Sequence, residues 1–170
     1  MRPRSAVVLY LLATAALAGD ERWPASLPAF SLKDVSGFTH TADEFLAHGG
    51  VIIVTAPNLS QGDAQHAWDA AFNGVAWPAG GPCFALVQDM SQSWFRGIVL
   101  GEMKEKYNPK GQPWLLLDEQ GTVRKAFGLG ENETVAFAFA PGGKRLGVET
   151  GTGTKERAAR LVKLLTDAAK

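Results

Sequence analysis

Hydrophobic positions along the chain form short strand-like runs that alternate with amphipathic stretches. Residues 51–55 are an uninterrupted, mostly β-branched run, which predicts a strand covered on both faces. Residues 83–87 and 114–117 predict two further buried strands. Residues 61–72 and 91–107 carry apolar side chains at helical spacing, so we expect a helix after each of the first two strands.

Turn and cap signals complete the predicted order of elements. Residues 30–38 predict a hairpin, and Thr41 predicts the N-cap of a short helix that Gly49 ends. Residues 122–127 predict another short helix, residues 134–140 and 145–149 a second hairpin, and Thr154 the cap of the last helix.

The predicted helix at residues 91–107 would begin at Ser91 and pack an aromatic stripe into the core. The side chains expected on that inward face are those of Trp94, Phe95, Ile98, Val99, Met103 and Tyr107.

This order predicts an α/β fold. Strands separated by helices require parallel crossovers, whereas the tight turn makes the last two strands antiparallel. We therefore expect a three-layer sandwich in which helices cover both faces of a central mixed β-sheet, preceded by an N-terminal β-hairpin.

Three phrases of the sequence, "LPAFSLKDVSGFTHTADEFLAHGGVIIVTAP", "LLLDEQGTVRKAFGL" and "TVAFAFAPGGKRLGVETG", occur in the order typical of one superfamily. They resemble the thioredoxin-like superfamily, in its redoxin and peroxiredoxin-type (AhpC/TSA) branch. Within it the chain is most similar to small exported YtfJ-type members, which lack the CxxC cysteines. The resemblance covers about residues 27–166 and implies a thioredoxin-like fold.

The resemblance also implies where redox chemistry would lie. The family's two cysteines would fall near Leu59 and Gly62, and a peroxidatic cysteine near Ser60, at a helix N-terminus that stabilises a thiolate. None of these positions holds sulfur, and the later segment with Glu133 and Thr134 has neither the family's cis-proline nor its arginine. Two elements of the redox site are therefore absent together.

We expect this loop to serve contact instead of catalysis. Asn58 or Ser60 would cap the following helix, whose free N–H groups are available to an anion or a peptide backbone. The predicted remnant of the active site comprises Pro57, Asn58, Leu59, Ser60, Gln61, Gly62, Glu133 and Thr134.

Cys83 is the single cysteine, so the chain has no internal disulfide. We expect it to be an inert core residue. A reactive or dimer-forming thiol is the alternative. The three histidines are dispersed, so we predict no metal site, and no motif predicts a cofactor.

The net charge and the N-terminal sequence predict where in the cell the protein is found. Seventeen basic residues balance seventeen acidic ones, which gives no attraction to nucleic acid. Arg2 and Arg4 precede an apolar run that is short for a membrane span, which predicts a signal peptide over residues 1–18, cleaved near Ala18, with a retained anchor as the alternative. We predict an extended lead-in at 19–26, a domain at 27–170 and no membrane span after cleavage.

The leading hypothesis is an exported, periplasmic or secreted, thioredoxin-fold protein that binds an envelope protein or a peptide without catalysis. The alternative is a thiol oxidoreductase or peroxidase that works through Cys83 with an external reductant. A structural protein or an unrelated enzyme stays open, and the sequence predicts no oligomeric state.

Overall fold

The computed structural model describes residues 22–77, 81–92, 96–106 and 113–170. These residues form one seven-stranded sheet with the strand order β2-β1-β5-β4-β3-β6-β7. The strands are β1 (Ser31–Asp34), β2 (Thr39–Thr41), β3 (Gly50–Thr55), β4 (Cys83–Asp89), β5 (Trp114–Asp118), β6 (Thr134–Phe139) and β7 (Arg145–Thr150).

The centre of the sheet is the predicted β-branched run. All residues of β3 are buried, and β3 pairs in parallel with β4 and antiparallel with β6. The β4–β5 pair is parallel, whereas β1 and β7 join antiparallel at the two sides. The sheet is therefore mixed, and its central strands β3, β4 and β6 are buried along their whole length because both of their faces are covered.

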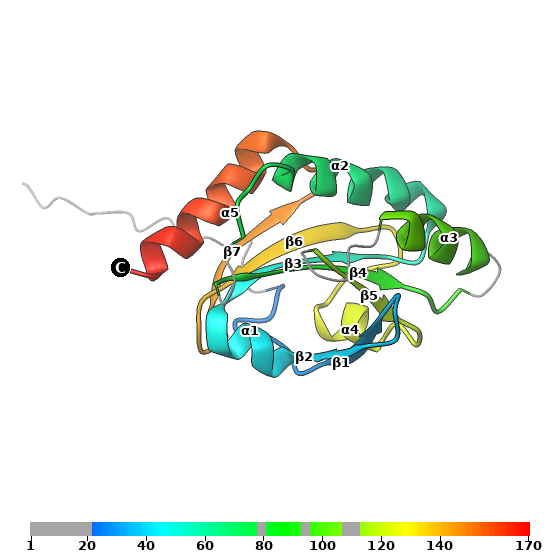
Figure 1. The fold of residues 1–170 in the computed structure, drawn as a ribbon, viewed down its shortest axis with the longest axis horizontal. Helices are drawn as coiled ribbons and strands as arrows, with labels where there is room; N and C mark the ends of the chain where they lie inside the picture. Colours follow the sequence, from blue (N-terminus) through cyan, green and yellow to red (C-terminus); the bar gives the residue numbers. More distant parts are fainter. Residues whose placement is uncertain (1–21, 78–80, 93–95, 107–112) are drawn as a thin grey trace, which may run out of the picture.

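Helices cover both faces of this sheet (Figure 1). One face packs against α2 (Gly62–Phe72), α3 (Arg96–Lys106) and α5 (Lys155–Ala168). The other face packs against α1 (Ala42–His48) and α4 (Thr122–Ala126). Each face has its own apolar cluster, since alternate residues of β3 point to opposite sides. The predicted three-layer α/β architecture is confirmed.

Most element boundaries agree with the sequence patterns. The Thr41 N–H donates to the Glu44 carboxylate at 3.1 Å, as a capping box requires, and Gly49 follows α1. At α5, Thr154 accepts a hydrogen bond from the Arg157 N–H. These local signals hold because they are satisfied within the first turn of each helix.

The predicted start of α3 at Ser91 is wrong. Ser91 and Gln92 are not helical, the Ser91 N–H donates to the Asp89 carboxylate at 2.7 Å, and the described part of the helix is Arg96–Lys106. Met103 is buried as expected, but Ile98 is 60% exposed and does not belong to the inward face. Trp94, Phe95 and Tyr107, and the side chain of Val99, lie outside the described residues.

The described part of the lead-in packs on the closing hairpin. Trp23 is buried, with its ring 5.6 Å from that of Phe137. The Leu27 N–H donates to the Gly143 carbonyl at 2.8 Å, and Arg145 Nη1 donates to the Trp23 carbonyl at 2.6 Å. Within the described ranges, no helix combines the length and the apolar character needed to cross a bilayer.

Candidate functional site

The loop after β3 and the segment before β6 lie side by side because these strands are antiparallel neighbours. Thr55 pairs with Thr134, and the Ala56 N–H donates to the Glu133 carbonyl at 2.9 Å. Thr134 Oγ1 donates to Gln61 Oε1 at 3.1 Å. The sheet thus brings together the two segments in which the resemblance implied a redox site.

A pocket of about 460 Å³ opens between these segments. One side is formed by Ser60 and Gln61, just before α2, and by Asp63 and Ala64 in its first turn. Another is formed by residues 132–135, and the third by residues 150–152 at the end of β7. Asp63 and Glu133 are the two charged residues among those that line it. The charged side chains of the lining are therefore both acidic.

Four of the predicted site residues, Ser60, Gln61, Glu133 and Thr134, line this pocket. The others lie around it: Pro57 is buried after β3, Leu59 belongs to a 3₁₀ turn, Gly62 begins α2, and the Asn58 side-chain amide donates to Asn132.

The predicted cap of α2 is wrong. The residue before the helix is Gln61, which makes no side-chain capping hydrogen bond. Asn58 Oδ1 instead accepts from the Ser60 N–H at 3.0 Å and stabilises the 3₁₀ turn Leu59–Gln61. This turn shifts the helix start beyond the reach of both Asn58 and Ser60.

Sequence reasoning missed the third wall of the pocket. The predicted site did not include residues 150–152, which line the pocket from the end of β7. Strand register explains this third wall: Val135 pairs with Thr150, which brings the end of β7 beside the start of β6.

Glu133 is the best-defined charge at the pocket. Its Oε2 accepts from the Gly130 N–H at 2.6 Å and from Arg22 Nη2 at 2.5 Å. Desolvation raises the pKa of Glu133, but the hydrogen bonds from Arg22 and Gly130, together with the charge of Arg22, outweigh it and hold this pKa below its ordinary value. Glu133 therefore stays ionised at neutral pH.

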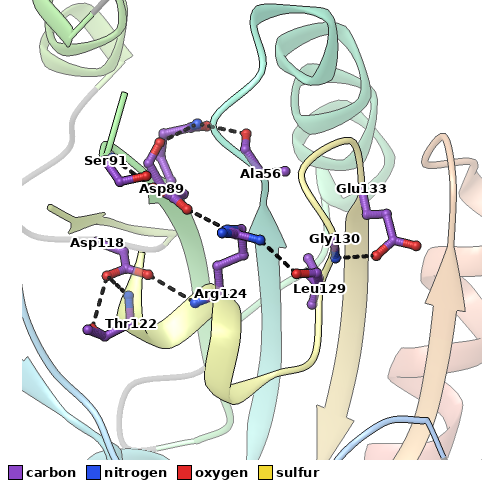
Figure 2. A network of polar contacts seen from close by, with 10 residues as sticks. Ala56, Asp89, Ser91, Asp118, Thr122, Arg124, Leu129, Gly130 and Glu133 are labelled. Carbon is purple, nitrogen blue, oxygen red and sulfur yellow. Dashed lines mark hydrogen bonds and ion pairs between the residues drawn. The ribbon is translucent and has the colours of Figure 1, made fainter. Parts of the chain in front are cut away.

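A buried ion pair supports the segment that carries Glu133 (Figure 2). Arg124 Nε donates to the fully buried Asp89 at 2.6 Å, and Arg124 Nη1 donates to the Leu129 carbonyl at 2.7 Å. The Arg124 backbone N–H donates to Asp118 at 2.9 Å. Three elements, β4, β5 and α4, thereby fix the start of the 129–133 segment.

Cys83 lies at the other end of the sheet. It is 3% exposed and pairs with Gly50, at the start of β3, whereas the pocket loop follows Thr55. At a rise of about 3.3 Å per residue, roughly 17 Å of strand separates the two ends. Burial, aided by the negative charge of Glu44, raises the pKa of Cys83 from 9.0 to about 12. Its thiol is therefore protonated at neutral pH.

In the part of the chain that the structure describes, no cluster of three or more histidine, cysteine, aspartate or glutamate side chains could hold a metal ion. His40 has two carboxylate neighbours, Asp34 at 3.3 Å and Glu44 at 3.4 Å, but its ring also stacks on Trp114 with centroids 4.3 Å apart. These contacts hold the His40 ring in place by packing and hydrogen bonding within the fold.

The fold is that of thioredoxin-like redoxin proteins, as solved structures show. MTB dsbF, solved in mixed oxidized and reduced forms, is similar with a TM-score of 0.58 and 24% identity, over 84% of this chain and 98% of that one. The thioredoxin domain of a thiol-disulfide oxidoreductase from Bacteroides vulgatus gives 0.57 and 14%, over 82% and 97%.

Peroxiredoxin Q from Xanthomonas campestris gives a TM-score of 0.54 and 18% identity, over 86% of this chain and 96% of that one. The thioredoxin-like fold that the resemblance implied is thus confirmed, while the likeness to YtfJ-type members stays a prediction. No protein-family model matches the chain, and no match was found among curated proteins.

Proposed function

We propose that this protein is an exported thioredoxin-fold binding module that holds a peptide or protein partner at the pocket between α2, β6 and β7, without thiol chemistry. One observation carries the proposal. The pocket lies where the fold's reactive loop lies, while the single cysteine is buried at the opposite end of the sheet.

Physical chemistry weighs against the thiol alternative. The thiolate is the species that attacks a disulfide or a peroxide. With a pKa of about 12, roughly one Cys83 in a hundred thousand is ionised at pH 7. Its Sγ contacts the Glu44 carbonyl at 3.6 Å and belongs to the apolar cluster under α1, so a substrate sulfur would have to displace core side chains.

Turnover assays separate the two functions. We expect the native protein to show no insulin-disulfide reduction and no peroxide consumption beyond that of Cys83→Ser, and Cys83 to react with a thiol reagent only after denaturation. Turnover that depends on Cys83 contradicts the proposal and supports the oxidoreductase.

Contact at the pocket needs its own measurement. A photoreactive side chain introduced at Thr152, on the pocket rim, should cross-link a specific partner from the host envelope. The same group at Lys163, which is exposed on α5, is the matched control. Equal cross-linking from both positions contradicts a partner at the pocket.

Export is the remaining part of the proposal, and it is supported by the charged and apolar pattern of residues 1–18. N-terminal sequencing of the protein from a fractionated host should give Gly19 as the first residue. A cytoplasmic protein that keeps Met1 contradicts it.

A further inference from the structure

The charges around the pocket indicate which chemical group it accepts. Its lining contributes the carboxylates of Asp63 and Glu133 and no basic side chain, together with the polar side chains of Ser60, Gln61 and Asn132. A lining of oxygen acceptors around two negative charges favours a cationic group over an anion.

The chain itself supplies an example of such a group. Arg22, from the lead-in, donates through Nη2 to Glu133 Oε2 and to the Gly128 carbonyl at 3.5 Å, and its guanidinium lies 4.3 Å from the centre of the Trp23 ring. A guanidinium from another part of the chain is therefore already bound to a carboxylate of the pocket lining.

Arg22 leaves part of this carboxylate unused. All contacts of Glu133 within the described residues go through Oε2, so Oε1 keeps its acceptor capacity. Arg22 is 51% exposed, and exposed ion pairs of this kind contribute about 1 kcal/mol or less. A second guanidinium can therefore share or replace this contact.

Two nearby features would favour an anion, and both are already compensated. The free N–H groups at the start of α2 attract negative charge, but Asp63 supplies a carboxylate in that first turn. Arg157 is not part of the lining: its Nη1 donates to the carbonyls of Thr150 at 2.7 Å and Thr152 at 2.8 Å, and its Nε pairs with the Glu149 carboxylate at 3.7 Å.

We infer that the pocket binds an arginine or lysine side chain of an extended peptide segment, in competition with Arg22. This inference rests on the proposed binding function and names its ligand class. Glu133 is the primary acceptor of the cation, Asp63 adds the second negative charge, and the Arg124–Asp89 pair holds the Glu133 segment in place.

The test uses capped peptides of alanine and threonine that differ at one central position: arginine, lysine, the neutral isostere citrulline, or glutamate. Binding to the full-length mature protein is followed by amide NMR shifts, which also locate the site. We expect the arginine and lysine peptides to shift Gly130, Thr134 and Gly151, and to bind about tenfold or more tightly than the citrulline and glutamate peptides.

Single-residue variants test which side chains bind the cationic group. Glu133→Gln should weaken the arginine peptide about tenfold, whereas Arg22→Ala should tighten it by up to about fivefold, the equivalent of the surface pair that it removes. Glu119→Gln, an exposed carboxylate that also pairs with an arginine, is the matched control and should change nothing. Methylguanidinium tests whether a free cation binds without a peptide. If it binds as tightly as the arginine peptide, the inference that the ligand is a peptide segment is overturned.

The remaining outcomes separate this inference from the proposed function. Equal binding of all four peptides at the pocket overturns the cationic preference and leaves the binding function standing. Tighter binding of the glutamate peptide overturns it in favour of an anion. Absence of binding of every peptide, to wild type and to Arg22→Ala, overturns the inference, while the cross-linking at Thr152 still decides the proposed function separately.

Discussion

The two ends of β3 differ in both packing and chemistry. At its start, Gly50 lies so close to β4 that a Cβ atom added to it would be 2.2 Å from the Cys83 carbonyl oxygen, and the thiol beside it is shielded from water. At its end, Thr55 leads into polar loops, a pocket and two carboxylates. The end of β3 beside the Cys83 thiol is tightly packed, and the end beside the pocket has no cysteine.

This difference separates a densely packed end of the sheet from an open end with a pocket. The thiol end contributes to the core cluster under α1, where packing density determines the free energy of unfolding. The pocket end consists of loop residues fixed by a few polar contacts, where a side-chain change alters the surface chemistry at little cost in stability.

The largest expected effect comes from filling the space at the thiol end. Gly50→Ala forces a Cβ against the backbone of Cys83, so we expect a loss of at least about 4 kcal/mol in the free energy of unfolding, or failure to fold. Gly62→Ala is the matched control at the pocket end, because nothing lies within 4 Å of its Cβ position. Chemical denaturation should leave this control unchanged or slightly more stable, and equal losses would contradict the comparison.

A second variant tests whether the pocket end also depends on a buried group. Arg124→Met leaves the fully buried Asp89 without its counter-charge, so we expect a loss of about 3–5 kcal/mol in thermal or denaturant unfolding. Lys125→Met, on the exposed side of the same helix, should cost little. If Arg124→Met lost less than about 1 kcal/mol in the free energy of unfolding, the ion pair would be dispensable for stability.

Moving the thiol from one end to the other should change its reactivity. In a Cys83→Ala background, Gly62→Cys places a thiol at the start of α2, where helix N–H groups stabilise the thiolate. We expect it to react with a disulfide reagent at pH 7.5 at least about a hundredfold faster than native Cys83. Similar rates would show that position in this fold does not control the thiol.

The raised pKa of Cys83 predicts a loss of stability at alkaline pH. In the unfolded chain the thiol ionises near pH 9, whereas in the folded protein it stays protonated up to about pH 12. Folding stability from this group is therefore fully present below pH 9 and falls between pH 9 and 12, by at most about 1.4 kcal/mol per pH unit. The difference between wild type and Cys83→Ala isolates this slope. Parallel pH profiles would contradict it.

The smallest effect on stability is expected at the pocket. Glu133→Gln and Arg22→Ala each break an exposed ion pair, so we expect changes of less than about 1 kcal/mol. Because the pKa of Glu133 is lowered, its contribution is present above the ordinary glutamate pKa and is lost as the pH falls through the folded value. A large loss of stability in either variant would show that the pocket end is structural after all.

Sequence patterns predicted the strands and helices well because their signals are local. The β-branched run of β3 and the Thr41 cap need only neighbours a few positions away. The Ser91 cap was predicted wrongly although its competitor is also local, because the Asp89 carboxylate two residues earlier accepts a hydrogen bond from the Ser91 N–H.

The candidate site was predicted in part. The resemblance placed Ser60, Gln61, Glu133 and Thr134 in the redox region, and they line the pocket. The buried role of Arg124 could not be predicted from the sequence. A basic residue in a short helix is typical of a surface position, and its partner Asp89 lies 35 residues earlier. Such long-range polar partners are set by strand order and register, which the chain specifies only after it has folded.

Trp68 gives the pocket an optical reporter. Its ring is fully buried in α2, and its Nε1 donates at 2.8 Å to the carbonyl of Gly151, a residue of the pocket rim. Indole emission and near-ultraviolet circular dichroism respond to a change in this hydrogen bond. A ligand that moves the rim should therefore change the contribution of Trp68, one of five tryptophans, to these spectra without contacting its ring.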